Sequence, residues 1–197
     1  MTPTELILIR HGETSTPGTL LGWTDSPLSV EGVATMEKVS AKLAVEKFDA
    51  IYSSDLDRSV ASAKIMAKPH GMEVARIPAL REMNMGRWDG VLFSILMETE
   101  PEMLRAFWAD KENCRTPGGE SLSDLRSRVL PAVEELRKKH EGGRIMVVAH
   151  GGVNRVILFT ALGLSLSRYY KVEQRCGSVN RISYFPDGNE VVTLVNG

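Results

Sequence analysis

The chain has 197 residues, of which 43% are hydrophobic and 25% charged, and its formal net charge is −1 with histidine neutral. This balance is typical of one globular domain with its own core, and it excludes a disordered, collagen-like or coiled-coil chain. A general nucleic-acid binder would carry a basic excess, which is missing here. Only two cysteines are present, Cys114 and Cys176, so a disulfide-rich secreted scaffold is excluded and we expect two free thiols.

No segment predicts membrane insertion or export. The longest uncharged apolar stretch considered, residues 156–167, has 12 residues, which are too few to cross a bilayer. Residues 6–9 form a short apolar run between Glu5 and Arg10, typical of a buried strand and not of a signal peptide. We therefore expect a cytoplasmic protein without a membrane partner.

Short apolar runs alternate with helical patterns along most of the chain. Strands are predicted at residues 6–9, 50–53, 73–77 and 144–149, and helices at residues 31–47, 54–67, 121–139 and 151–162. Two of the helices begin with a pattern resembling a capping box, Ser54-x-x-Asp57 and Ser121-x-x-Asp124. Pro131 lies inside the third helix and predicts a kink or a split there.

This alternation predicts an α/β fold, a three-layer α/β/α sandwich with a mostly parallel central sheet. Residues 179–185 and 190–195 are joined by Pro-Asp-Gly-Asn, which predicts a hairpin and makes the sheet mixed. Residues 83–119 are rich in Met, Trp and Phe. We interpret them as a small helical cap inserted into a single domain of residues 1–197.

Basic side chains follow several of the predicted strands. Arg10 and His11 follow the first strand, Arg58 lies in the helix after the second, and His150 and Gly151 follow the strand at residues 144–149. Because ligands bind at the carboxyl ends of strands in such sheets, these residues are expected to converge. Two guanidinium groups, an imidazole and the helix N-terminus at Gly151 predict a site for a phosphate dianion.

His11 is the candidate nucleophile, since a neutral imidazole can attack phosphorus and carry the phosphoryl group. The leaving alkoxide needs a proton, so a carboxylic acid must lie nearby. Glu82 follows the strand at residues 73–77 and is the first choice, with Glu13 as the second. Gly22 and Thr24 are candidates for a substrate loop, although a plain turn is equally open.

Six motifs follow one another along nearly the whole chain. They are residues 10–14 (RHGET), 22–29 (GWTDSPLS), 54–58 (SDLDR), 80–88 (LREMNMGRW), 118–121 (GGES) and 147–152 (VVAHGG). Together they resemble the histidine phosphatase superfamily in its phosphoglycerate-mutase-like branch. The resemblance implies His11 as the phosphorylated nucleophile, Glu82 as the proton donor, a phosphate pocket of Arg10, Arg58 and His150, and neither a metal nor an organic cofactor. The chain departs from the pattern at Thr16 and Pro17, where the family often has Asn.

The substrate expected from the resemblance is a small-molecule phosphate ester. Residues 172–182 and 194–196 look most like α-ribazole phosphatases, which act late in cobalamin assembly and would make α-ribazole 5′-phosphate the substrate. The apolar cap suits a hydrophobic or aromatic leaving group. The adjacent arginine pair that mutases of this family carry is missing, because the sequence contains no Arg-Arg.

Three other functions stay open at this stage. A phosphoglycerate mutase would convert 3-phosphoglycerate to an isomer instead of releasing phosphate. A metal hydrolase could use His11, His150 and Glu82, but the ligand spacing is wrong and the two arginines would repel a cation. A non-catalytic phosphate sensor or scaffold would not need all three of these side chains. The oligomeric state is also open, with a homodimer as one option.

Overall fold

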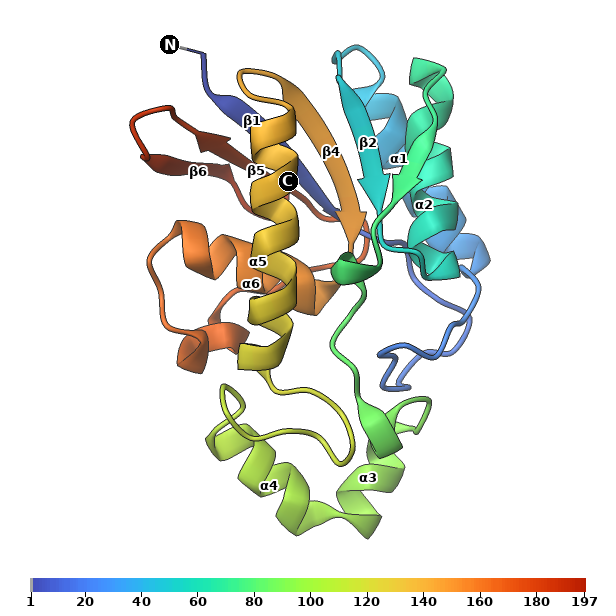
Figure 1. The fold of residues 1–197 in the computed structure, drawn as a ribbon. Helices are drawn as coiled ribbons and strands as arrows, with labels where there is room; N and C mark the ends of the chain where they lie inside the picture. The colour runs from blue at the N-terminus through green and yellow to red at the C-terminus, as the bar shows by residue number, and fades with distance from the viewer. Residues whose placement is uncertain (1) are drawn as a thin grey trace.

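A single six-stranded sheet forms the centre of the molecule (Figure 1), and the computed structural model describes residues 2–197. Its order is β3-β2-β4-β1-β5-β6. The strands are β1 (Thr4–Arg10), β2 (Ala50–Ser53), β3 (Val74–Arg76), β4 (Arg144–Ala149), β5 (Val179–Tyr184) and β6 (Glu190–Leu194). The first four are parallel, and β5 and β6 form the predicted antiparallel hairpin. The mixed sheet is therefore confirmed.

Helices cover both faces of the sheet, as the three-layer prediction requires. One face carries α1 (Val30–Leu43) and α2 (Asp57–Ala67), and the other carries α5 (Leu122–Lys139) and α6 (Gly151–Ala161). Alternate residues of β1 serve the two layers: Ile7 and Ile9 pack toward α1 and α2, and Leu6 and Leu8 toward α5 and α6. All four are buried, which explains why this strand is a continuous apolar run.

Two helix predictions differ from the structure. The second helix begins at Asp57 without a side-chain cap, because the Ser54 hydroxyl lies 2.7 Å from His150 Nε2 instead. The helix α5 has the predicted capping box of Ser121 and Asp124, but it continues through Pro131 as one helix. The split was wrong because five buried residues on both sides of Pro131 hold the two halves against the core: Leu122, Leu125, Val129, Val133 and Leu136.

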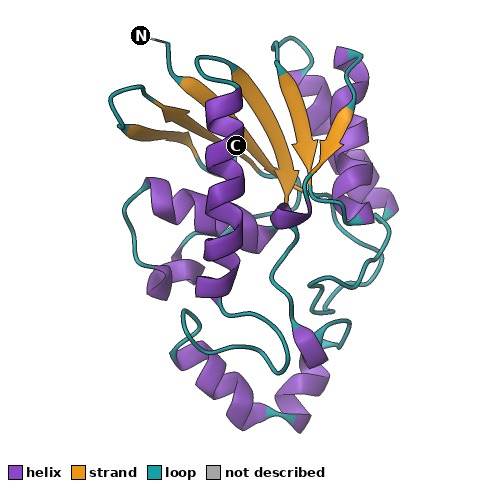
Figure 2. Cartoon of the chain, viewed as in Figure 1, coloured by secondary structure: helices purple, strands orange, loops and turns teal. Residues whose placement is uncertain are grey.

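The segment between β3 and α5 lies beyond the carboxyl ends of the parallel strands, where Figure 2 shows its helices tied to the rest by long loops. It contains α3 (Phe93–Thr99) and α4 (Pro101–Ala109). Leu96, Leu104 and Phe107 are buried and belong to the same core as α5 and α6. Short 3-10 helices complete the fold: Lys68–His70, Pro78–Leu80, Gly86–Trp88 and Leu166–Lys171. Among residues 2–197, no helix is long and apolar enough to cross a membrane.

Candidate active site

His11 lies directly after β1 and is 6% exposed. Its Nδ1 is 2.7 Å from the carbonyl oxygen of Gly12, which can only accept, so Nδ1–H is the donor. Burial, followed by the charges of Arg10 and Arg58, lowers the pKa of His11 to about 3. The ring is therefore neutral near pH 7 and keeps a lone pair on Nε2, as attack on phosphorus requires.

Three side chains near His11 each have a buried nitrogen atom without a hydrogen-bond partner in the described chain. They are Nε of Arg10, Nε of Arg58 and Nδ1 of His150. The rings of His11 and His150 stand edge to face with their centroids 5.0 Å apart. A buried donor without a hydrogen bond destabilises the folded state, and an anionic ligand that accepts a hydrogen bond from it would remove this penalty. The residues predicted from separate segments to bind phosphate thus lie together around His11.

The loop of residues 22–25 holds the side chain of Arg58, which is 1% exposed. Its Nη2 donates to the carbonyl oxygen of Gly22 at 2.6 Å, and its Nη1 donates to that of Thr24 at 3.0 Å and pairs with Asp25 at 3.3 Å. The Asp89 carboxylate accepts the backbone N–H of Gly22 at 2.8 Å and of Thr24 at 3.0 Å. Gly22 and Thr24 therefore orient Arg58 through their backbone, while its buried Nε has no hydrogen-bond partner in the described chain.

His150 sits fully buried at the end of β4. Burial, then the neighbouring His11 and the two arginines, hold the pKa of His150 well below its usual range. The ring is therefore neutral, and its Nε2 lies 2.7 Å from the Ser54 hydroxyl. When that hydroxyl donates, Nδ1 carries the proton and can donate to a phosphate oxygen.

Glu82 reaches the same site from the segment after β3. Its Oε2 accepts the backbone N–H of Gly152 at 2.9 Å, and its Oε1 accepts that of Met83 at 2.7 Å. A Cβ at position 152 would lie 2.1 Å from Oε1, so only glycine lets the carboxylate approach the start of α6. Glu13 is exposed, and the geometry favours Glu82 as the acid.

Arg128 of α5 holds the backbone that carries Glu82. Its guanidinium makes five hydrogen bonds, among them Nη1 to the carbonyl oxygens of Ala79 and Arg81 at 2.8 and 2.7 Å and Nη2 to that of Glu82 at 2.7 Å. The Glu120 carboxylate pairs with the same guanidinium at 2.7 Å. Through these contacts, Arg128 fixes the backbone position of Glu82. Nothing in the sequence pattern around Arg128 predicted this role.

A cavity of about 190 Å³ opens beside the predicted phosphate pocket. It is lined by Arg10, Glu82, Gly151 and Gly152 at the pocket, by the apolar side chains of Leu20, Leu21, Met83, Met85, Phe107 and Leu122, and by Lys111, Arg155, Tyr169 and Tyr170. The sequence did not predict Lys111, Arg155 or Tyr169 as site residues. One signal for Arg155 was available, because it lies four residues after Gly151 on the same face of α6.

The two positions where asparagine was missing do not supply a substitute amide. The Thr16 hydroxyl donates to Ser26 Oγ at 2.9 Å, and Pro17 is exposed. Cys114 and Cys176 are both free, as expected. In the described part of the chain, no group of three or more His, Cys, Asp or Glu side chains is placed to hold a metal ion.

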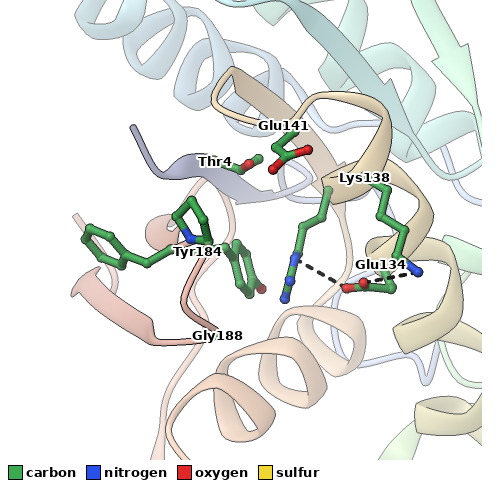
Figure 3. Close-up of a pocket in the computed structure, with 9 residues that line it drawn as sticks. Thr4, Glu134, Lys138, Glu141, Tyr184 and Gly188 are labelled. Carbon is green, nitrogen blue, oxygen red and sulfur yellow. Dashed lines mark ion pairs between the residues drawn. The ribbon is translucent and has the colours of Figure 1, made fainter. Parts of the chain in front are cut away.

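A second cavity, of about 240 Å³, lies at the opposite edge of the sheet (Figure 3). Thr4 at the start of β1, Tyr184 at the end of β5 and Glu134 and Lys138 of α5 line it. Glu134 pairs with Lys138 at 3.5 Å and with Arg137 at 3.3 Å. This cavity is the larger of the two but brings none of the predicted catalytic residues together.

Comparisons with known proteins show what the chain is similar to. The sequence profile described as "Histidine phosphatase superfamily (branch 1)" matches residues 6–197. A metal-independent phosphoserine phosphatase of Arabidopsis thaliana is 38% identical over 78% of this chain and 67% of its own length. A probable phosphoglycerate mutase of Enterobacter is 31% identical over 91% of this chain and 85% of its own. The crystal structure of an α-ribazole phosphatase from Shigella flexneri superposes with a TM-score of 0.89, covering 98% and 96% of the two chains at 24% identity.

Proposed function

The chain belongs to branch 1 of the histidine phosphatase superfamily and is a small-molecule phosphatase, and from this premise we propose that it works through a phosphohistidine on His11. The observation that carries the proposal is the free Nε2 of a neutral His11 beside three buried nitrogen atoms without partners. A phosphate dianion placed among them would receive hydrogen bonds from Arg10, Arg58 and His150. Preorganised donors of this kind stabilise the charge that develops on the transferring phosphoryl group.

In the first step, Nε2 of His11 attacks phosphorus and the bond from phosphorus to the ester oxygen breaks. The leaving oxygen takes the proton of the Glu82 carboxylic acid, so that a neutral alcohol departs. The backbone N–H groups of Met83 and Gly152 keep the carboxyl group beside the pocket during this transfer. The products of the step are the alcohol, phospho-His11 and the Glu82 carboxylate.

In the second step, the Glu82 carboxylate takes a proton from water, and the resulting hydroxide attacks phosphorus. The bond from phosphorus to Nε2 breaks, which returns neutral His11, releases inorganic phosphate and leaves Glu82 protonated for the next cycle. The first step needs the acid form of Glu82. We therefore propose an acid-type phosphatase.

Residues 83–119 act in this proposal as the cap that selects the leaving group. Met83, Met85 and Phe107 line the cavity beside the pocket, which supports a substrate with an apolar body. The resemblance in the C-terminal third favours α-ribazole 5′-phosphate. The name of the Arabidopsis relative adds phosphoserine as a second candidate, and the name of the Enterobacter relative keeps the mutase reaction as an alternative.

Product analysis separates these functions. Phosphate release is measured from α-ribazole 5′-phosphate, phosphoserine, 3-phosphoglycerate and nitrophenyl phosphate in the presence of a strong chelator. The proposal expects free phosphate and undiminished rates with chelator. Isomerised phosphoglycerate without phosphate release identifies a mutase, loss of activity with chelator identifies a metal hydrolase, and no turnover of any ester favours a sensor or scaffold.

A further inference from the structure

The cavity beside the phosphate pocket holds more positive charge than one phosphate group needs. Arg10 and Arg58 already supply two guanidinium groups for a dianion. Lys111 and Arg155 also line the cavity, and Glu82 is its one acidic lining residue. Among residues 2–197, neither Lys111 nor Arg155 forms an ion pair with an acidic side chain. Partly buried cations without a counter-charge point to a second anionic group that arrives with the ligand.

Arg155 stands next to the phosphate pocket. A Cβ at Gly151 would lie 3.4 Å from Nη1 of Arg155 and 3.5 Å from Nε of Arg10, so the two guanidinium groups flank the same glycine. Nε of Arg155 donates to the carbonyl oxygen of Val172 at 2.7 Å, and its Cζ lies 4.9 Å from the ring centre of Tyr169. These contacts fix the side chain beside Gly151.

Lys111 approaches from the other side of the cavity. It follows α4, and its carbonyl oxygen accepts the backbone N–H of Leu122 at 3.2 Å, which anchors it at the start of α5. Its ammonium lies 4.7 Å from the ring centre of Tyr170, and Cζ of Arg155 lies 6.0 Å from the same ring. The two cations therefore share one aromatic neighbour and border one small space.

We propose that Lys111 and Arg155 bind a second anionic group, a carboxylate or a second phosphate, on the alcohol part of the substrate. The proposal rests on the proposed function, since it places the first phosphate at His11. It favours phosphorylated hydroxy acids and bisphosphates, and so it revises the substrate choice from α-ribazole 5′-phosphate, which has no second anion, toward phosphoserine or 3-phosphoglycerate. The apolar side chains of the cavity then contact the carbon atoms of the leaving group. The cavity of about 190 Å³ suits a leaving group of a few carbon atoms.

Two pairs of matched substrates test this proposal through kcat/KM. 3-Phosphoglycerate and glycerol 3-phosphate differ by one carboxylate, as do phosphoserine and phosphoethanolamine, and glycerol 1,3-bisphosphate replaces the carboxylate by a phosphate. Because a charge-assisted hydrogen bond is involved, we expect the charged member of a pair to be preferred by about tenfold or more. The better of the carboxylate and bisphosphate arms identifies the second group.

The variants Lys111→Met and Arg155→Gln assign that preference to the two cations. Each is expected to lower the preference by about tenfold, mainly through KM of the charged ester, with little change for glycerol 3-phosphate. Lys111→Arg should restore the preference, because it restores the charge. Lys171→Met is the matched control, since Lys171 is exposed and outside the cavity lining, and it should leave the preference unchanged.

Three results would overturn the inference: a wild-type preference near one, equal losses on both members of a pair in Lys111→Met, or the same effect in Lys171→Met. Nitrophenyl phosphate keeps this failure distinct from failure of the proposed function. If the wild-type enzyme hydrolyses nitrophenyl phosphate and His11→Ala does not, the phosphohistidine proposal stands while the second-anion site falls. If no ester is hydrolysed at all, the proposed function itself has failed.

Discussion

The two ends of the parallel strands carry cavities of similar size that differ in how completely the nearby polar side chains are paired. At the edge shown in Figure 3, Glu134 is paired with Arg137 and Lys138, and Arg137 also reaches Glu190 at 3.2 Å. At the carboxyl ends of the parallel strands, Arg10 and Arg58 each keep a buried nitrogen without a partner. Unpaired buried donors destabilise a folded chain, and the proposed function accounts for them by placing the substrate phosphate there.

The largest effect is expected at the carboxyl ends of the parallel strands, where His11 lies. His11→Ala removes the nucleophile and should lower phosphate release from nitrophenyl phosphate on the order of 10⁴-fold. Lys138→Met, in the cavity of Figure 3, is the matched control. It should leave kcat unchanged, since it removes only one exposed ion pair. Equal losses in both variants would erase the functional difference between the two cavities.

Glu82→Gln separates proton donation from binding. The amide keeps the shape of the side chain but cannot supply a proton, so kcat should fall about 10²- to 10⁴-fold for alkyl esters. Nitrophenyl phosphate, whose leaving group needs no proton, should lose much less. A similar loss on both kinds of ester would show that Glu82 is not the acid.

Arg128→Met tests the support behind the site. The variant loses the hydrogen bonds to the carbonyl oxygens of Ala79, Arg81 and Glu82, so the carboxyl group shifts and kcat should fall on the order of 10-fold or more. A positioning role predicts a larger loss for alkyl esters than for nitrophenyl phosphate, as in Glu82→Gln. Uniform losses on all esters, in step with lost thermal stability, would leave only a structural role.

The smallest effect concerns stability. Because the pKa of His11 is lowered to about 3 in the folded chain and is near 6.5 when unfolded, the unfolded state binds the extra proton between these values. The free energy of unfolding should therefore fall as the pH drops from 7 to 5, by about 2 kcal/mol from His11. Denaturant unfolding of His11→Ala should show a smaller fall than wild type or Lys138→Met. Identical slopes in all three proteins would contradict the buried neutral ring.

The sequence was most informative where the deciding interactions are local. The apolar run in β1 and the capping pair Ser121 and Asp124 predicted their elements because each works within a few residues. The similar pattern at Ser54 predicted a helix cap that does not form, since the Ser54 hydroxyl has a partner 96 residues away in His150. Tertiary contacts of this kind override local preference.

The candidate site also contains residues that the sequence could predict and residues that only long-range contacts place. Residues on the carboxyl ends of strands could be predicted, because parallel strands bring their ends to one edge. Arg128 and Asp89 could not, since their partners lie 46 and 67 residues away in the chain, at Glu82 and Gly22. Lys111 became visible as a site residue only when the fold placed it beside Tyr170.

Rapid quenching of the enzyme during turnover of a ³²P-labelled ester tests the central claim most directly. The account predicts a labelled protein whose phosphoryl group is stable in alkali and lost in acid, with the label mapped by mass spectrometry to Nε2 of His11. The label should be missing in His11→Ala and should persist longer in Glu82→Gln, because activation of water is then impaired. Turnover at the full rate with no labelled His11, or with the label on another residue, would contradict the account.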